Sequence, residues 1–104
     1  MTVVEILFFD GCPGHAVVAD VVERIIRDAS LDVEVRHVEI ADDNAAKELR
    51  FLGSPTVRVD GRDVDPEADG RSDFAMQCRV YSVNGKLRNA PAREWIERAL
   101  GVGA

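Results

Sequence analysis

The chain has 104 residues, which is the size of a single domain and leaves no room for a separate regulatory module. Its 13 basic and 19 acidic side chains give a formal net charge of -6, which argues against a nucleic-acid backbone or an anionic membrane as the main partner. The two cysteines, Cys12 and Cys78, are too few and too distant for a disulfide-framework fold or a four-cysteine zinc site. We therefore expect residues 1–104 to form one small acidic domain that acts through a small site or a protein partner.

The first predicted element is a strand over residues 3–9, which are dense in Val, Ile, Leu and Phe and end at the turn signal Asp10-Gly11. A short apolar run of this kind is typical of a strand buried on both faces, near the middle of a sheet. The run includes Glu5 and follows no basic segment, which is unlike a signal peptide. No run approaches the length of a membrane span, and we expect a cytoplasmic protein whose cysteines are normally reduced.

A helix is predicted over residues 14–29, because apolar side chains recur there at helical spacing while charged ones fill much of the other face. Pro13 suits a first helical residue, since its φ is already helical and it needs no donor. Alternating valines then predict a strand over residues 32–40. His37 falls on the valine face of that strand, and we interpret it as an edge histidine rather than a metal ligand.

A short helix through Leu49 comes next, with Asp42 or Asp43 as its N-cap and Gly53 as its stop. Residues 54–64 then alternate on both sides of an Asp-Gly pair. This pattern is the clearest β-hairpin in the chain, because Asp-Gly suits a two-residue hairpin turn.

The stretch over residues 65–77 has little periodicity, and the acidic run from 63 to 73 is interpreted as a solvated loop. Residues 78–83 predict one more short strand, closed by an Asn-Gly pair. The chain ends in a helix over residues 91–100 with Pro91 near its first helical position.

The predicted order is therefore β-α-β-α-β-β, an irregular insert over about residues 65–90, and a final helix. The first strand, helix and strand should form a right-handed parallel crossover, and the hairpin should add an antiparallel edge. Helices on both faces of a mixed four-stranded sheet complete this α/β architecture.

The segment that carries chemistry surrounds Cys12, which lies between a buried strand and the first turn of a long helix. Unpaired backbone N–H groups and the positive end of the helix dipole meet there. Both favour the thiolate, the form in which a cysteine is nucleophilic or binds metal. Pro13 sets where the helix starts and so where the sulfur points.

A strand, a Cys-Pro helix start, a β-α unit and Ser54-Pro55-Thr56-Val57 at the start of a hairpin together resemble the thioredoxin/glutaredoxin superfamily. The similarity in element order covers most of residues 3–64 and resumes at 91–100. It implies a thioredoxin-like sandwich in which Pro55 follows a cis peptide bond and packs against Cys12. It also implies that the Ser54 backbone faces a bound substrate thiol or peptide. The substrate-binding residues implied by the resemblance are Pro13, Ser54 and Pro55.

The chain departs from the family at His15, which replaces the second cysteine of a Cys-x-x-Cys motif and makes a local dithiol cycle impossible. In one remaining cycle, like that of monothiol glutaredoxins, Cys12 forms a mixed disulfide with a protein or a small thiol such as glutathione or mycothiol. His15 would supply positive charge or a proton. In the other, the insert brings Cys78 close and a 12–78 disulfide forms. The candidate catalytic residues are Cys12, Cys78 and His15.

Two further functions stay open. The segments also look like those of small bacterial thioredoxin-family proteins, some of which are labelled alkylmercury lyase by loose similarity. A mercury site would use Cys12, Cys78 and Asp10, and a four-ligand zinc site would combine both cysteines with His15 and His37. The other possibility is a redox-inactive thioredoxin-like domain that binds a protein partner. We expect no tightly bound cofactor and no resident metal, and the sequence leaves the substrate, enzymatic activity and oligomeric state open.

Overall fold

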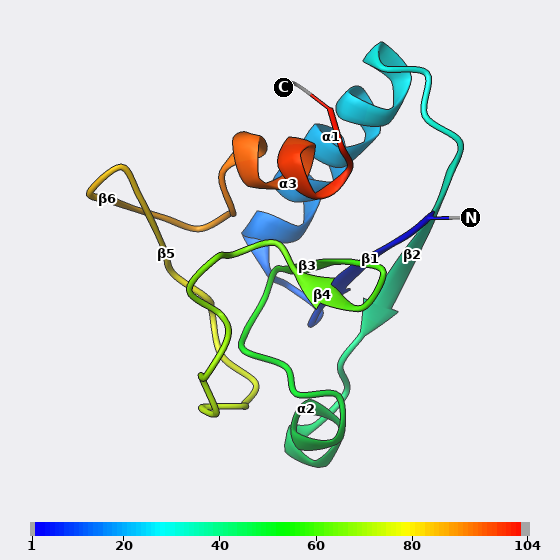
Figure 1. The fold of residues 1–104 in the computed structure, drawn as a ribbon. Helices are drawn as coiled ribbons and strands as arrows, with labels where there is room; N and C mark the ends of the chain where they lie inside the picture. The colour runs from blue at the N-terminus through cyan, green and yellow to red at the C-terminus, as the bar shows by residue number, and fades with distance from the viewer. Residues whose placement is uncertain (1, 103–104) are drawn as a thin grey trace.

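A computed structural model describes residues 2–102 of the chain. In chain order its elements are β1 (Thr2–Phe8), α1 (Pro13–Asp28), β2 (Val33–Glu39), α2 (Asp43–Glu48), β3 (Thr56–Val59), β4 (Arg62–Asp63), β5 (Tyr81–Val83), β6 (Lys86–Arg88) and α3 (Arg93–Ala99). The first four strands form one sheet, and β5 and β6 form a separate two-stranded sheet, which extends away from the larger sheet in Figure 1.

The larger sheet has the strand order β2-β1-β3-β4. Strand β1 pairs in parallel with β2, with Thr2 opposite Val33, and antiparallel with β3, with Leu7 opposite Thr56. The β3–β4 hairpin turns at Asp60-Gly61, whose φ angles of 51° and 82° suit a two-residue hairpin turn. The predicted α/β architecture with a mixed four-stranded sheet is thus confirmed.

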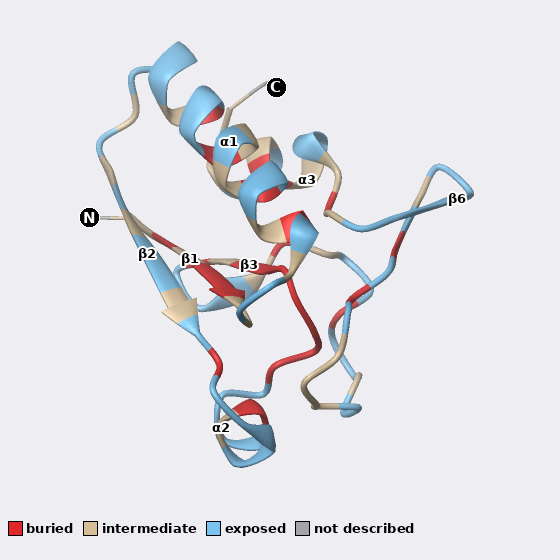
Figure 2. Cartoon of the chain, turned by 180° about the vertical axis from the view of Figure 1, so that it is seen from behind, coloured by how far each residue is buried: buried red, intermediate tan, exposed pale blue. Residues whose placement is uncertain are grey.

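Buried residues lie along β1, β3 and α1 in Figure 2. The two faces of β1 contribute to different parts of the core. Val4 and Ile6 are fully buried and pack with apolar residues of α1 and α3. Leu7 points to the opposite face and packs beside α2 with Phe51. Helices therefore cover both faces, as predicted. The prediction that β1 is buried on both faces holds only near Leu7, since α2 has six residues and leaves Glu5 half-buried.

The insert contains a second hairpin, of which the sequence pattern predicts only the first strand and the turn. Its turn lies at Asn84-Gly85, with φ angles of 52° and 78°, and β6 is the unpredicted partner of β5. The predicted strand over 78–83 is also too long, because β5 begins at Tyr81. Cys78 instead forms an isolated parallel bridge with Ser54, which lies just before β3 of the larger sheet.

Two predicted helix boundaries are wrong for identifiable reasons. Helix α2 uses Asp42 as its N-cap, but it ends with Leu49 as the C-cap, so Gly53 is not its stop. Glycine is needed at position 53 for a different reason, because a Cβ atom there would lie 2.9 Å from Arg79 Cβ. Pro91 does not begin α3, because Ala92 is the N-cap residue of that helix.

Candidate functional site

Cys12 is the N-cap residue of α1, and the residues around it explain this placement. Gly11 turns the chain with a φ of 87°, and Pro13 starts the helix. The Cys12 backbone is extended, with φ -76° and ψ 118°, and its N–H donates to the Phe9 carbonyl at 3.3 Å. The residue is half-buried at the positive end of a 16-residue helix, where negative charge on a sulfur is stabilised.

Pro55 packs against the first turn of that helix. The Ser54–Pro55 peptide bond is cis, which is the geometry implied by the resemblance. A Cβ atom at Gly14 would lie 2.9 Å from Pro55 Cδ and 2.6 Å from the Asn89 carbonyl oxygen. Only glycine permits so close an approach, and this approach places Pro55 against the helix two residues after Cys12.

Ser54 joins the two segments that carry cysteines. Its hydroxyl accepts a hydrogen bond from the Phe9 N–H at 3.4 Å, at the end of the strand that leads to Cys12. Its backbone N–H donates to the Gln77 carbonyl at 2.8 Å, and its carbonyl accepts from the Arg79 N–H at 3.0 Å. The Ser54 backbone is therefore already paired with the residues on either side of Cys78. An extended substrate chain could pair with these two backbone groups only if residues 77–79 moved away, and the substrate-binding role that the resemblance implies for Ser54 stays a prediction.

The two cysteines differ in their surroundings. Cys12 is half-buried, Cys78 is exposed, and both are free thiols. Val80, close to Cys78 in the insert, is also 58% exposed. The insert thus presents a second thiol to solvent beside the residue that precedes Pro55.

His15 interacts with β2 through its side chain. Its ring stacks on Phe8 with centroids 3.6 Å apart, and its Nε2 lies 3.0 Å from Nδ1 of His37. Burial, and secondly the charge of His37, lower the pKa of His15 below its ordinary value of 6.5. The imidazole is therefore mainly neutral at neutral pH, which argues against the expected supply of positive charge to Cys12. The alternation of β2 had placed His37 on the correct face but could not show its partner.

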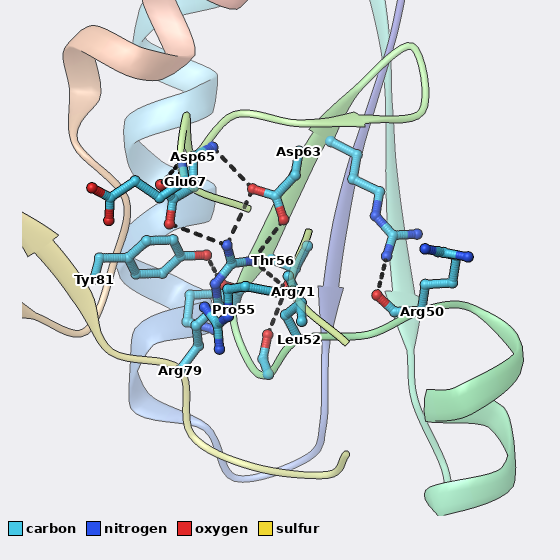
Figure 3. A network of polar contacts seen from close by, with 12 residues as sticks. Arg50, Leu52, Pro55, Thr56, Asp63, Asp65, Glu67, Arg71, Arg79 and Tyr81 are labelled. Atoms are coloured by element: carbon cyan, nitrogen blue, oxygen red, sulfur yellow. Dashed lines mark hydrogen bonds and ion pairs between the residues drawn. The ribbon is translucent and has the colours of Figure 1, made fainter. Parts of the chain in front are cut away.

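A buried arginine that no sequence pattern indicates attaches the insert to the sheet (Figure 3). The Arg79 side chain is fully buried and pairs with Asp63 Oδ2 at 2.7 Å and with Asp65 Oδ2 at 3.3 Å. It also donates to Thr56 Oγ1 at 3.0 Å. The start of the acidic run is therefore not the solvated loop we expected, because the Asp63 and Asp65 side chains are only 13% and 11% exposed.

Tyr81 extends this network to Pro55. Its ring lies against the Arg79 guanidinium, 4.4 Å from centroid to carbon, and its hydroxyl donates to the Pro55 carbonyl, as Figure 3 shows. Burial raises the pKa of Tyr81, so the phenol stays protonated and able to donate. Pro55 is thus held between α1 on one side and the insert on the other.

The metal sites considered from the sequence are not assembled. Residues 2–102 contain no group of three or more His, Cys, Asp or Glu side chains placed to hold a metal ion. Neither Cys12 with Cys78 and Asp10, nor both cysteines with His15 and His37, therefore forms a ligand set.

No protein-family model, curated protein or solved structure matches the chain. Over the described range, no helix is both long and apolar enough to cross a membrane. The function therefore has to be inferred from the geometry around Ser54 and Pro55.

Proposed function

We propose that this protein is a thioredoxin-like thiol–disulfide exchange protein in which Cys12 is the nucleophile and Cys78 is the resolving cysteine. The observation that carries the proposal is the meeting of both cysteine-bearing segments at Ser54, directly before a cis proline. The mixed four-stranded sheet and the contact of Pro55 with the first turn of α1 support the thioredoxin-like assignment.

In the first step, the Cys12 thiolate attacks one sulfur of a disulfide R–S–S–R′. A bond forms between Cys12 Sγ and the RS sulfur, the S–S bond of the substrate breaks, and R′S⁻ leaves and takes a proton from solvent. The N-terminus of α1 stabilises the attacking thiolate. His15 takes no part in this step, because its ring is directed to His37.

In the second step, the Cys78 thiolate attacks Cys12 Sγ and expels RS⁻, leaving a Cys12–Cys78 disulfide. Two thiols of the protein are oxidised and one substrate disulfide is reduced to two thiols. Two molecules of a low-molecular-weight thiol reverse the change, and they become a disulfide in turn. The exposure of Cys78 leaves its sulfur accessible for this attack.

The occupied Ser54 backbone favours a small disulfide as the substrate. An extended client chain would need the N–H and carbonyl of Ser54, and these already pair with Gln77 and Arg79. A low-molecular-weight disulfide needs only access to the Cys12 sulfur. A protein disulfide remains a substrate only if residues 77–79 leave Ser54.

The proposal is tested by incubating the reduced protein with glutathione disulfide and following its intact mass. The wild type should lose two hydrogens as the 12–78 disulfide forms. Cys78→Ser should instead accumulate a single glutathione adduct, and peptide mapping should place it on Cys12. Cys12→Ser should form neither product at a comparable rate, because it lacks the nucleophile.

Cys78→Ser and Cys12→Ser are matched controls, since each removes one sulfur and leaves the other. An adduct on Cys12 in the wild type, with no 12–78 disulfide, would overturn the role of Cys78 and leave a one-cysteine cycle. Equal reactivity of wild type and Cys12→Ser would overturn exchange altogether.

A redox-inactive binding domain is the second candidate, favoured by His15 at the position of the missing motif cysteine. That function requires neither thiol. A Cys12→Ser protein with unchanged biological activity would support it over thiol exchange.

A further inference from the structure

A cavity of about 350 Å³ opens between the end of α2, the β3–β4 hairpin and the insert. Four of its lining residues are arginines, although the chain as a whole carries a net charge of -6. They are Arg50, Arg58, Arg62 and Arg71. Neither cysteine lines this cavity, so the cavity is distinct from the site proposed for thiol exchange.

The acidic residues that line the same cavity already have partners. Both carboxylate oxygens of Asp63 accept hydrogen bonds from Arg79. Asp60 accepts from the Val3 N–H at 2.9 Å, and Asp69 lies 3.8 Å from Arg62. These carboxylates therefore do not neutralise the remaining arginines by direct contact.

Arg58 and Arg50 are the two lining arginines without an acidic partner. Among residues 2–102, no carboxylate lies within 4.0 Å of either guanidinium. Arg58 is half-buried and donates only to neutral groups, the carbonyls of Leu49 at 2.7 Å and Arg50 at 2.9 Å. The Arg50 guanidinium lies over the Phe74 ring, 5.2 Å from its centroid, where it is held at the cavity.

Arg58 is partly desolvated in this position and has no counter-charge in direct contact. Burial lowers the pKa of Arg58, although the more distant charges of Asp63 and Glu5 act in the opposite direction. An anion placed in direct contact would offset this desolvation, because charge-assisted hydrogen bonds from guanidinium to an oxyanion are strong and frequently bidentate.

We propose that this cavity binds a small anion through a phosphate or carboxylate group held by Arg50 and Arg58. The cavity is at the lower end of the size range of small-molecule sites, which suits a metabolite rather than a macromolecule. The site is independent of the proposed thiol exchange, and its test does not involve either cysteine.

The experiment is an NMR titration of the isotopically labelled full chain with inorganic phosphate and, separately, with succinate, against sodium chloride at matched ionic strength. Saturable shifts of backbone amides around Arg50, Arg58 and Phe74 support the proposal, and the anion that saturates at the lower concentration identifies the preferred group. Arg50→Gln should weaken that binding by about tenfold or more.

Two further variants separate binding from folding and from general charge. Arg88→Gln removes the same charge from an exposed position on β6 and should leave the affinity within about twofold. Arg58→Lys keeps the charge but not the planar guanidinium fork. It should also weaken binding, while its amide spectrum remains that of a folded protein. Shifts that rise without saturation for both anions, or equal affinities in Arg50→Gln and Arg88→Gln, would overturn the proposal.

Discussion

The sheet with α1 and the insert over residues 65–90 are held in place by different interactions. In the sheet and α1, fully buried apolar side chains such as Ile6 and Val22 form a continuous core. In the insert only three residues are buried: Ala68, Arg79 and Tyr81. Two of these three act through polar contacts, Arg79 with two aspartates and Tyr81 with the Pro55 carbonyl.

Apolar burial therefore holds the sheet and α1 together, whereas hydrogen bonds and ion pairs hold the insert against them. Apolar burial is non-directional and roughly proportional to area, so it holds helices on a sheet whatever the chemistry. Hydrogen bonds and ion pairs require particular distances and angles. In this molecule they set where Cys78 lies relative to Ser54 and Pro55. Changes in the insert should therefore alter the site while the sheet remains folded.

The largest effect is expected from Arg79→Met. The variant leaves Asp63 and Asp65 without their buried counter-charge, and removing one partner of such a pair should cost about 3 kcal/mol of unfolding free energy. Urea unfolding measures the total, and residue-resolved hydrogen exchange shows where protection is lost. We expect the loss at Ser54, whose amide pairs with Gln77, to exceed any loss in β1.

Arg62→Gln is the matched control, because Arg62 and Asp69 are 83% and 85% exposed. It should change the unfolding free energy by no more than about 0.5 kcal/mol. If Arg79→Met were equally mild, or if it removed protection uniformly from β1 and the insert, the contrast between the two regions would be wrong.

A smaller effect is expected from Tyr81→Phe, which removes the donor to the Pro55 carbonyl and should cost about 1 kcal/mol at neutral pH. Because burial raises the pKa of Tyr81 above 10.0, its contribution is complete below pH 10 and is lost as the pH rises above that value. The wild type should therefore lose stability above pH 10 more steeply than Tyr81→Phe. Unfolding curves of both proteins at neutral pH and above pH 10 measure the difference.

Absorbance of the phenolate gives an independent check, since Tyr81 is the only tyrosine of the chain. The native protein should show no ionisation near pH 10, whereas the unfolded protein should. A native phenol that titrates like a free one would show that the insert does not cover Tyr81 in solution.

The smallest effect is expected at the pair formed by His15 of α1 and His37 of β2. His37→Gln should raise the pKa of His15 toward 6.5, though only in part, because burial is the larger cause of the lowering. The lowered pKa also means that His15 favours the folded state above pH 6.5 and loses this contribution as the pH falls below it. NMR titration of the His15 imidazole measures the shift. Arg36→Gln, on the same strand, should leave it unchanged, and an unaltered pKa in His37→Gln would exclude the pairing.

The parts of the fold that were predictable are those in which burial follows a period. Strand β1, helix α1 and the β3–β4 hairpin have the expected order because their apolar residues repeat with the spacing of the element. Strand β6 was not predictable in this way, since all three of its residues are exposed. The turn pair Asn84-Gly85 was the one local signal for it.

Arg79 is the clearest case of a buried polar residue that spacing could not reveal. An arginine between Cys78 and Val80 is expected to be solvated, because arginine is seldom fully buried unless it is paired. Its partners Asp63 and Asp65 lie in a run of acidic residues with no distinguishing pattern. The position of Cys78, and with it the proposed resolving step, depends on this pairing.

By itself the sequence determined the mixed sheet, the order of its elements and the position of Cys12 at the start of α1, because local spacing, caps and turn residues encode these features. Only the tertiary structure decided that residues 77–79 lie along Ser54, that Tyr81 reaches Pro55 and that Arg50 and Arg58 face one cavity. These are contacts between residues far apart in the chain, made by directional polar groups. Such groups leave no period in the sequence, so folding alone shows which of them meet.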